Sequence, residues 1–278
     1  MRLGGFQVDI FSDGIFRLDG GAIFGVVPKV LWEKVKPADE RNRVAMDMTC
    51  LLIRDRDGHV VLVETGAGAK LSERQRDIFG IDRPPALLGE LATRGVRPDE
   101  VTLVVNTHLH FDHAGGNTRF DGDRLVATFP RASYVFQRLE WQDATVPNER
   151  TRASYYPDDF RPLEAPGKLE LVDGTVEILP GVRLDRVQGH TRGTQTVRVS
   201  SGRETVFFSA DFMADRHHLP LPWISALDLF PLDTLEAKRL ILRRAVDEGW
   251  IVAFTHDTPR FGRLGEVDGK LRYEELTD

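Results

Sequence analysis

The chain has 278 residues, 41% of them hydrophobic and 29% charged, and its 43 acidic and 37 basic side chains give a formal net charge of −6. This composition is typical of a globular protein with a large core, and the mild acidity argues against nucleic-acid binding through long-range attraction. The single cysteine, Cys50, excludes a disulfide framework and any CxxC motif, while no apolar stretch approaches the roughly 18 residues that span a bilayer. Because the first residues also lack the pattern of a secretory signal, we expect a cytoplasmic protein with a small-molecule substrate and with no nucleic-acid or membrane partner.

Short β-type and helical patterns alternate along the chain. Residues 59–64 are expected to form a strand that pairs with its predecessor across the turn at 55–58. Residues 101–105 are almost continuously β-branched, which is typical of a strand buried on both faces. The last helix is predicted to begin with Asp233-Thr-Leu-Glu236 as a capping box and to end at Gly249. Strands are also predicted at 6–11, 48–54, 132–136, 182–187, 196–199, 205–209 and 250–254, and helices at 71–79 and 84–93.

This alternation, without a repeat or a linker, predicts one layered α/β domain over residues 1–278, with sheets inside and helices outside. Two long segments, 26–46 and 147–167, are weakly patterned and rich in proline, arginine and acidic residues. Loops of this length in a compact domain are usually functional covers or simply irregular.

Three of the eight histidines lie in one heptapeptide, Thr107-His108-Leu109-His110-Phe111-Asp112-His113, directly after the strand predicted at 101–105. In an extended chain His108 and His110 project to the same side. After a turn, Asp112 and His113 can project towards the same space. Neutral imidazoles and a carboxylate form a ligand set that zinc, iron or manganese accepts. A merely hydrogen-bonded loop is the alternative, and four ligand-type side chains in six positions disfavour it.

Three more ligand-type residues each follow the end of an apolar strand: His190, Asp211 and His256. Each alone would more often be a core or loop residue. Together they indicate convergence on one site, because strand ends at one edge of a sheet are where α/β folds gather chemistry.

The ordered set His-x-His-x-Asp-His, Gly-His190-Thr, Ser-Ala-Asp211 and a strand-end His256 resembles the metallo-β-lactamase superfamily along nearly the whole chain. The resemblance implies a four-layer αββα sandwich of two mixed sheets with a two-metal site at one edge. It implies that His108, His110 and His190 hold one metal ion, that Asp112, His113 and His256 hold the second, and that Asp211 bridges both. The expected cofactors are two divalent ions, zinc first, with iron or manganese as alternatives.

Such a site favours hydrolysis, because two cations acidify a water between them and polarise a carbonyl or phosphoryl oxygen. Asp112 or Asp211 is the candidate to carry the water proton to the leaving group. Covalent catalysis has no support, since the chain lacks Gly-x-Ser-x-Gly and its one cysteine lies in a predicted core strand.

Length and motifs are similar to the lactonase branch, so the first hypothesis is cleavage of an ester or lactone, with acyl-homoserine lactone as one candidate. Two departures are visible: Ala214 stands where those lactonases place a tyrosine, and Glu64 replaces an aspartate in Val63-Glu64-Thr65-Gly66, where it is expected to support a metal ligand. Tyr155, Tyr156 or His217 is the candidate to replace the missing tyrosine hydroxyl. The alternative for the two tyrosines is that they only pack within a loop that covers the site. Apolar residues that are candidates to line an acyl-chain groove are Ile23, Phe24, Trp223, Ile224 and Phe230.

Other functions remain open at this point. The same ligand set suits a phosphotriester or thioester hydrolase, a mononuclear-iron enzyme similar to persulfide dioxygenases, or a metal-containing ligand sensor with little turnover. A homodimer is the default assembly for a soluble enzyme.

Overall fold

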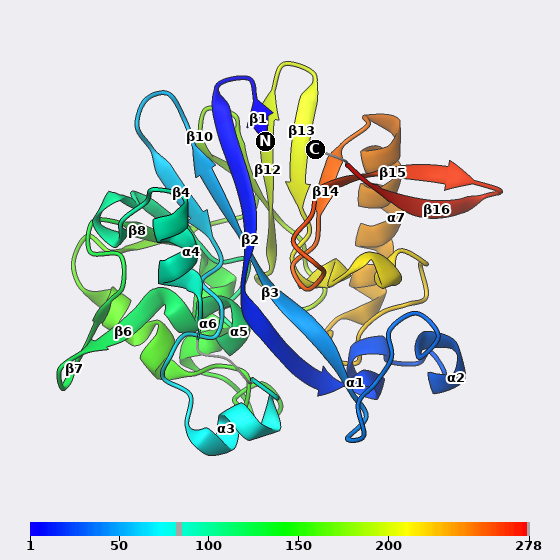
Figure 1. The fold of residues 1–278 in the computed structure, drawn as a ribbon, viewed down its shortest axis with the longest axis horizontal. Helices are drawn as coiled ribbons and strands as arrows, with labels where there is room; N and C mark the ends of the chain where they lie inside the picture. Colours follow the sequence, from blue (N-terminus) through cyan, green and yellow to red (C-terminus); the bar gives the residue numbers. More distant parts are fainter. Residues whose placement is uncertain (82–84, 277–278) are drawn as a thin grey trace.

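The computed structural model describes residues 1–81 and 85–276. Two seven-stranded sheets lie face to face, with helices on their outer sides (Figure 1). The first sheet has the order β1-β2-β3-β4-β5-β8-β9 and the second runs from β10 to β16 in chain order. This four-layer arrangement confirms the predicted αββα class. The strands of the first sheet are β1 (Arg2–Leu3), β2 (Phe6–Asp19), β3 (Arg43–Arg54), β4 (Val60–Val63), β5 (Leu103–Val105), β8 (Ser133–Gln137) and β9 (Leu169–Val172).

The second sheet and the helices complete the chain. The second sheet holds β10 (Val176–Leu179), β11 (Val182–Arg186), β12 (Gln195–Ser201), β13 (Glu204–Phe208), β14 (Ile251–Ala253), β15 (Gly262–Val267) and β16 (Lys270–Glu275), while β6 (Thr118–Asp121) and β7 (Arg124–Ala127) form a separate hairpin. The α-helices are α1 (Gly20–Phe24), α2 (Lys29–Trp32), α3 (Glu73–Ile78), α4 (Leu87–Thr93), α5 (Phe111–Ala114), α6 (Arg138–Thr145) and α7 (Pro231–Asp247). None of the helices in the described ranges is long and apolar enough to cross a bilayer.

An apolar layer between the two sheets holds them together. Val63 and Val105 of the first sheet pack in one buried cluster with Val197, Phe208 and Ala253 of the second. Because side chains alternate along a strand, the opposite faces must be covered by other elements. Burying apolar surface on both faces therefore requires the outer helical layers.

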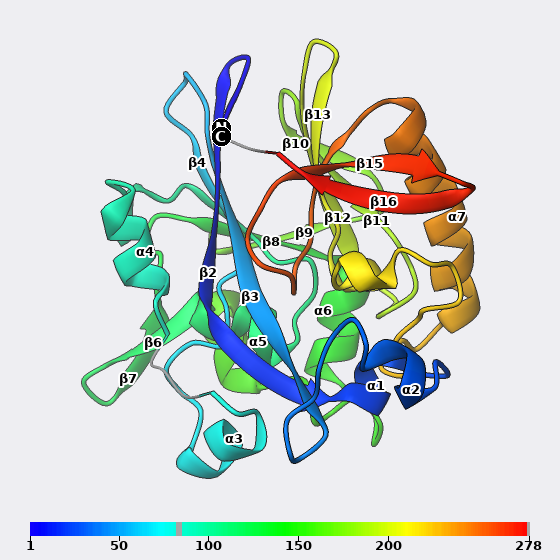
Figure 2. The same cartoon turned by 45° about the vertical axis from the view of Figure 1, so that its right-hand side comes forward.

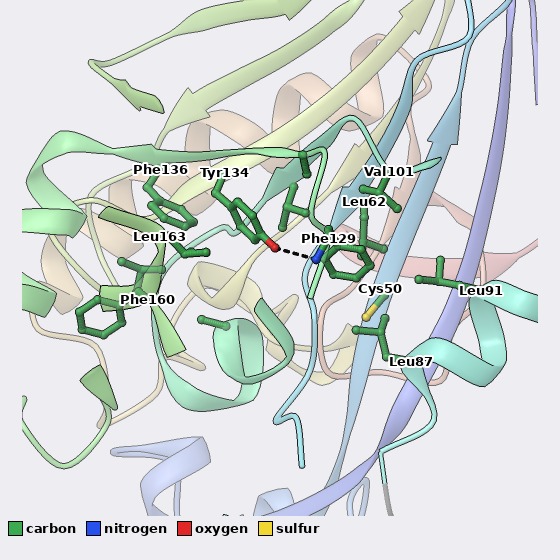
Figure 3. Packing of buried hydrophobic residues seen from close by; sticks show 14 of the residues in the cluster. Cys50, Leu62, Leu87, Leu91, Val101, Phe129, Tyr134, Phe136, Phe160 and Leu163 are labelled. Carbon is green, nitrogen blue, oxygen red and sulfur yellow. Dashed lines mark hydrogen bonds between the residues drawn. The ribbon is translucent and has the colours of Figure 1, made fainter. Parts of the chain in front are cut away.

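The outer face of the first sheet packs against α4 and α6. Tyr134 is fully buried in this cluster, and its hydroxyl accepts a hydrogen bond from the Phe129 amide at 3.1 Å (Figure 3). Cys50 lies in the same cluster, where burial raises the pKa of its thiol. It is therefore a core residue, as the sequence indicated. On the other side, α7 covers the second sheet and β15 packs against α7 (Figure 2).

Several element boundaries differ from those expected. The strand predicted at 6–11 continues to Asp19, because β2 stays paired with β3 beyond Ser12. The register shifts between Ser12 and Ile15, and the pairing then resumes. The last helix begins at Pro231, so Asp233 is in its first turn and the proposed capping box is wrong. The Asp233 carboxylate instead accepts a hydrogen bond from Gln188 at 2.7 Å. A helix was predicted to begin at Pro84, which lies outside the described residues. The first helix after it, α4, begins at Leu87.

Parallel pairing decides where the site forms. In the first sheet β4, β5 and β8 run parallel, and in the second β13 runs parallel to β14. The segments that follow these strands consequently leave the sheets at a common edge, as strand ends do in α/β folds. The heptapeptide that starts at Thr107 follows β5, while Asp211 follows β13 and His256 follows β14.

Candidate metal centre

The first group of candidate ligands consists of His108, His110 and His190. Nδ1 of His110 lies 3.0 Å from Nε2 of His108 and 3.1 Å from Nε2 of His190. Tetrahedral ligands about 2.0 Å from a zinc ion stand roughly 3.3 Å from one another. The three nitrogens are therefore spaced as the ligands of one cation would be, although His190 is 80 residues from His110.

The second group consists of Asp112, His113, Asp211 and His256. Oδ2 of Asp112 lies 3.4 Å from Nε2 of His113 and 3.5 Å from Nε2 of His256. All of these side chains except that of Asp211 are at most 8% exposed. This group thus offers a mixed nitrogen and oxygen ligand set from three separate segments.

Asp211 reaches both groups. Its Oδ1 lies 3.1 Å from Nε2 of His256 and 3.4 Å from Nε2 of His113, whereas its Oδ2 lies 3.5 Å from Nε2 of His190 and 3.9 Å from Nε2 of His108. One carboxylate therefore faces both nitrogen sets, as a bridging ligand must.

The donor atoms fit cations. Nε2 of His113 and Oδ1 of Asp211 are buried and have no hydrogen-bond partner among the described residues. Leaving such polar groups unpaired costs about 1–3 kcal/mol each, more for charged groups, unless something binds them. Seven ligand-type side chains around two adjacent points suit two divalent metal ions with nitrogen and oxygen ligands.

The histidines and the bridging carboxylate of the cluster differ in the direction of their pKa shifts. Burial, together with the neighbouring histidines, lowers the pKa of His108 well below its usual value and that of His110 to about 3. Burial raises the pKa of the Asp211 carboxyl, but the charges of His256 and His113 outweigh it and hold that pKa well below the usual value. Burial lowers the pKa of His113, but the charges of Asp211, Asp112 and Glu64 outweigh burial and raise it, and the pKa of His190 is raised as well. Because neutral imidazoles and ionised carboxylates are the forms that ligate metals, binding of cations would release protons from these two histidines.

Partners behind the ligands fix their orientation. Nδ1 of His190 donates to Oδ1 of Asp228 at 3.0 Å, and Nδ1 of His256 donates to the Asp47 carbonyl at 2.7 Å. Because both partners accept, the Nε2 lone pairs are left for a cation. Oε1 of Glu64 lies 3.2 Å from Nδ1 of His113 as an ion-pair contact, while the Glu64 carboxylate accepts hydrogen bonds from the Thr107 amide and the Asn106 side chain.

A buried carboxylate joins two of the ligand-bearing loops. Oε1 of Glu140, in α6, accepts from the Leu109 amide at 2.9 Å and from the Tyr155 hydroxyl at 3.0 Å. Its Oε2 accepts from the Thr191 hydroxyl at 2.5 Å. Leu109 lies between two candidate ligands and Thr191 follows a third, so Glu140 sets the distance between the loops. The sequence offered no signal for this role or for that of Asp228.

The backbone is strained beside the site. Ala210, which precedes Asp211, has φ 58°, and Glu64 at the end of β4 has φ 65°. A non-glycine residue in this region costs about 1–2 kcal/mol, and such residues cluster at functional sites. The Ala210 conformation precedes the carboxylate that reaches both ligand groups, whereas the Glu64 carboxylate lies behind His113.

An apolar cavity of about 360 Å³ opens onto the candidate ligands. Its size and mainly apolar lining match a small-molecule site. It is lined by Phe16, Leu18, Ile23, Met46, Phe79, His110, Phe111, Asp112, Arg150, Thr151, Ala153, Ser154, His190, Asp211, Ala214, Ser225, Ala226, Leu227, Leu229 and His256.

The sequence model of the Metallo-beta-lactamase superfamily matches residues 47–256, which include all seven candidate ligands. The chain belongs to this superfamily. It is a metallo-β-lactamase-fold hydrolase, homologous to lactonases and to other metal-dependent hydrolases.

Relatives agree with this membership. A crystal structure of a probable metal-dependent hydrolase from Staphylococcus aureus matches with a TM-score of 0.91 and 29% identity over 100% of this chain and 99% of that one. An N-acyl homoserine lactonase from Bacillus cereus is 22% identical over 229 residues, covering 78% of this chain and 83% of its own length. A dizinc quorum-quenching lactonase, AidC, with a bound homoserine product has the same fold, with a TM-score of 0.81 and 20% identity over 100% of this chain and 97% of that one.

In this metallo-β-lactamase-fold hydrolase, the two tyrosines expected to contact substrate do not line the cavity. Tyr155 is 2% exposed and its hydroxyl is bound to Glu140, so it is a packing residue behind His110. The ring of Tyr156 stacks on Phe111, with centroids 5.6 Å apart. Segment 147–167, called the cover segment below, does reach the cavity, through Arg150, Thr151, Ala153 and Ser154.

The other expected substrate contacts also lie elsewhere. Phe24 is fully buried between the rings of Trp32 and His218, and Trp223 packs edge-on against it. His217 and Trp223 line a separate hollow beside β16. The cavity next to the candidate ligands is therefore lined by none of the predicted substrate contacts Tyr155, Tyr156, His217, Phe24 and Trp223. Of the apolar candidates, Ile23 alone lines the cavity, and Ile224 lines a neighbouring groove.

Proposed function

We propose that this metallo-β-lactamase-fold chain is a dinuclear metal-dependent hydrolase that cleaves an ester or lactone bond. The observation that carries the proposal is the position of Asp211, whose two oxygens lie within 3.9 Å of four imidazole nitrogens belonging to two ligand groups. A site for one ion would not require a carboxylate between two sets.

The candidate ligands and Asp112 have separate roles in the proposed reaction. His108, His110 and His190 would hold one ion, Asp112, His113 and His256 the other, and Asp211 both. Divalent cations held in this way lower the pKa of water and polarise a carbonyl oxygen. Asp112 lines the cavity, and the neighbouring His113 charge lowers the pKa of its buried carboxyl against the opposing effect of burial. A cation in place of the His113 proton would keep this carboxyl ionised in the same way. We assign Asp112 to accept the water proton and return it to the leaving oxygen.

The cavity wall supports an uncharged reacting group with an apolar portion. Phe16, Met46, Phe79 and Leu229 contribute apolar surface next to the ligands. The relationship to N-acyl homoserine lactonases supports a lactone as one substrate. Ala214 also lines the cavity, so a tyrosine hydroxyl is not supplied from this position, and Thr151 and Ser154 are the hydroxyl residues of the cover segment on the wall.

Metal content and a substrate panel test the proposal together. We expect two zinc ions per chain by elemental analysis of metal-replete protein, and hydrolysis of lactones or aryl esters ahead of aryl phosphotriesters and thioesters. One iron per chain, together with oxygen consumption in the presence of a persulfide, would contradict the hydrolase proposal and indicate an oxygenase. Two bound metals without turnover of any panel member would favour a sensor.

The bridging role has its own test. Asp211→Asn is expected to lower metal content towards one ion per chain and to reduce turnover by roughly a hundredfold or more. Asp123→Asn, in the exposed turn between β6 and β7, is the matched control and should retain both ions. Full activity of the Asp211 variant would remove the bridging role.

A further inference from the structure

Charge on the cavity wall is distributed unevenly. Apart from the metal-ligand cluster, Arg150 is the single ionisable side chain among the described residues that line the cavity. The candidate ligands on the cavity wall are buried or half-buried, whereas Arg150 is exposed. Outside the ligand cluster, a lone and exposed guanidinium therefore lies on the wall of a mainly apolar cavity.

The Arg150 guanidinium keeps most of its donors available. One of its terminal nitrogens donates to the Ala226 carbonyl at 3.0 Å, and it forms no ion pair with a carboxylate in the described part of the chain. Asn148 holds the base of this turn, because its side-chain oxygen accepts from the Arg150 amide at 2.9 Å and from the Thr151 amide at 3.2 Å. Since a guanidinium has five N–H donors, a fork remains for a ligand.

A second groove, of about 900 Å³, meets the cavity at Arg150. The two hollows share Arg150, Ser225, Ala226 and Leu229. Other charged groups in the groove are already engaged: Arg239 pairs with Glu236, and Asp228 is bound by His190 and Thr234. An anionic group that enters by either route consequently meets Arg150 as the cation with free donors.

We propose that Arg150 is a specificity-determining residue that binds a carboxylate on the substrate, so that the preferred substrates are esters or lactones carrying a second, anionic group beyond an apolar spacer. This inference rests on the proposed hydrolase function. The scissile ester lies next to the candidate metal ligands, and the spacer packs against the apolar wall. The guanidinium pairs with the carboxylate through two parallel hydrogen bonds. Partial shielding by the apolar wall strengthens that pair relative to one in open water.

The first experiment compares two esters that differ only in the terminal group, 4-nitrophenyl octanoate and the mono-4-nitrophenyl ester of octanedioic acid. For the wild-type chain we expect kcat/KM to be about ten- to a hundredfold higher for the ester with the carboxylate, mainly through KM. Arg150→Gln keeps a donor for Ala226 and removes the charge, so the ratio between the two esters should fall to about one. Arg152→Gln, which removes an exposed arginine outside the cavity lining, should keep the ratio.

A binding measurement separates this inference from the proposed function. Calorimetric titration of the metal-loaded protein with octanoate and with octanedioate needs no turnover. We expect octanedioate to bind at least about tenfold more tightly than octanoate to the wild type and to the Arg152 variant, and equally to the Arg150→Gln variant. Equal binding by the wild type, or a preference that survives Arg150→Gln, would overturn the assignment even if both esters are hydrolysed. If neither ester is hydrolysed but the preference for octanedioate depends on Arg150, the binding site stands and the hydrolase proposal fails.

Discussion

His190 and Asp228 form a buried pair in which Nδ1 of the imidazole donates to the carboxylate at 3.0 Å. Burial lowers the pKa of His190, but the hydrogen bond to Asp228 and the charges of Asp211 and Asp228 outweigh burial and raise it. The other oxygen of Asp228 accepts from the Thr234 hydroxyl at 2.6 Å, which ties the ligand to the first turn of α7. Metal affinity should therefore depend on a residue that contacts no metal.

Asp228→Asn is expected to weaken metal binding by about ten- to a hundredfold, because the amide no longer holds the tautomer and orientation of His190 by charge. Competition with a chelator measures this loss directly. Asp233→Asn changes a surface-exposed carboxylate five residues further on and should leave affinity unchanged. An unaltered competition curve for the Asp228 variant would show that the pair serves packing alone.

Glu140 should matter for stability more than its place on a short surface helix suggests. Glu140→Ala leaves the Leu109 amide and the Thr191 hydroxyl without their acceptor, at an expected cost of about 2–4 kcal/mol in the free energy of unfolding. Tyr155→Phe removes one of the hydrogen bonds and should cost about 1 kcal/mol. Urea denaturation measures both.

The control for Glu140 lies on the same helix. Asp143 pairs with Arg192 at 2.6 Å, with the two side chains 31% and 40% exposed. Asp143→Asn should therefore cost less than about 1 kcal/mol. A Glu140→Ala variant as stable as the Asp143 control would contradict the bridging role of the buried carboxylate.

Asp13 predicts a pH dependence. Burial raises the pKa of its carboxyl from 3.8 to about 7, although amides including that of Leu87 at 2.6 Å oppose the shift, and Oδ2 has no partner among the described residues. Between about pH 4 and pH 7 the native chain then holds a proton that the unfolded chain has released, so this residue makes stability fall as pH rises.

Asp13→Asn should remove that component. The free energy of unfolding of the wild type minus that of the variant is expected to fall by about 1–4 kcal/mol between pH 4 and pH 7, and to level off above pH 7. Urea denaturation of both proteins at matched pH values gives this difference in the free energy of unfolding. The titration of the histidine cluster is common to both proteins and cancels in the subtraction. A difference independent of pH would mean that Asp13 titrates normally in the fold.

Lys238 is a buried amine without a carboxylate partner among the described residues, and burial lowers its pKa to about 7. Its Nζ donates to the carbonyls of Pro220 and Trp223, both at 2.8 Å, and of Leu221 at 3.2 Å. Lys238→Met keeps the stem but leaves these carbonyls without their donor, so the free energy of unfolding should fall by about 2–4 kcal/mol. Arg239→Ala, one residue further on and exposed, should cost less than about 1 kcal/mol in the same denaturation series.

The sequence by itself determined the strands that bound the site and the grouping of the candidate ligands. The heptapeptide from Thr107 to His113 was recognisable because ligand spacing and a preceding buried strand are local patterns, and His190, Asp211 and His256 were found because each follows an apolar strand. The alternation of strand and helix predicted a layered α/β domain, and the resemblance to a family implied its αββα layers.

Only the tertiary structure decided which groups stand behind the ligands and which line the cavity. Asp228 lies 38 residues from His190, and Glu140 lies 31 from Leu109 and 51 from Thr191. No periodicity encodes such contacts, because they depend on how the loops pack after both sheets have closed. For the same reason the tyrosines of the cover segment turned inward to packing and hydrogen-bonding partners, while Arg150, which has no local signal, lies on the cavity wall.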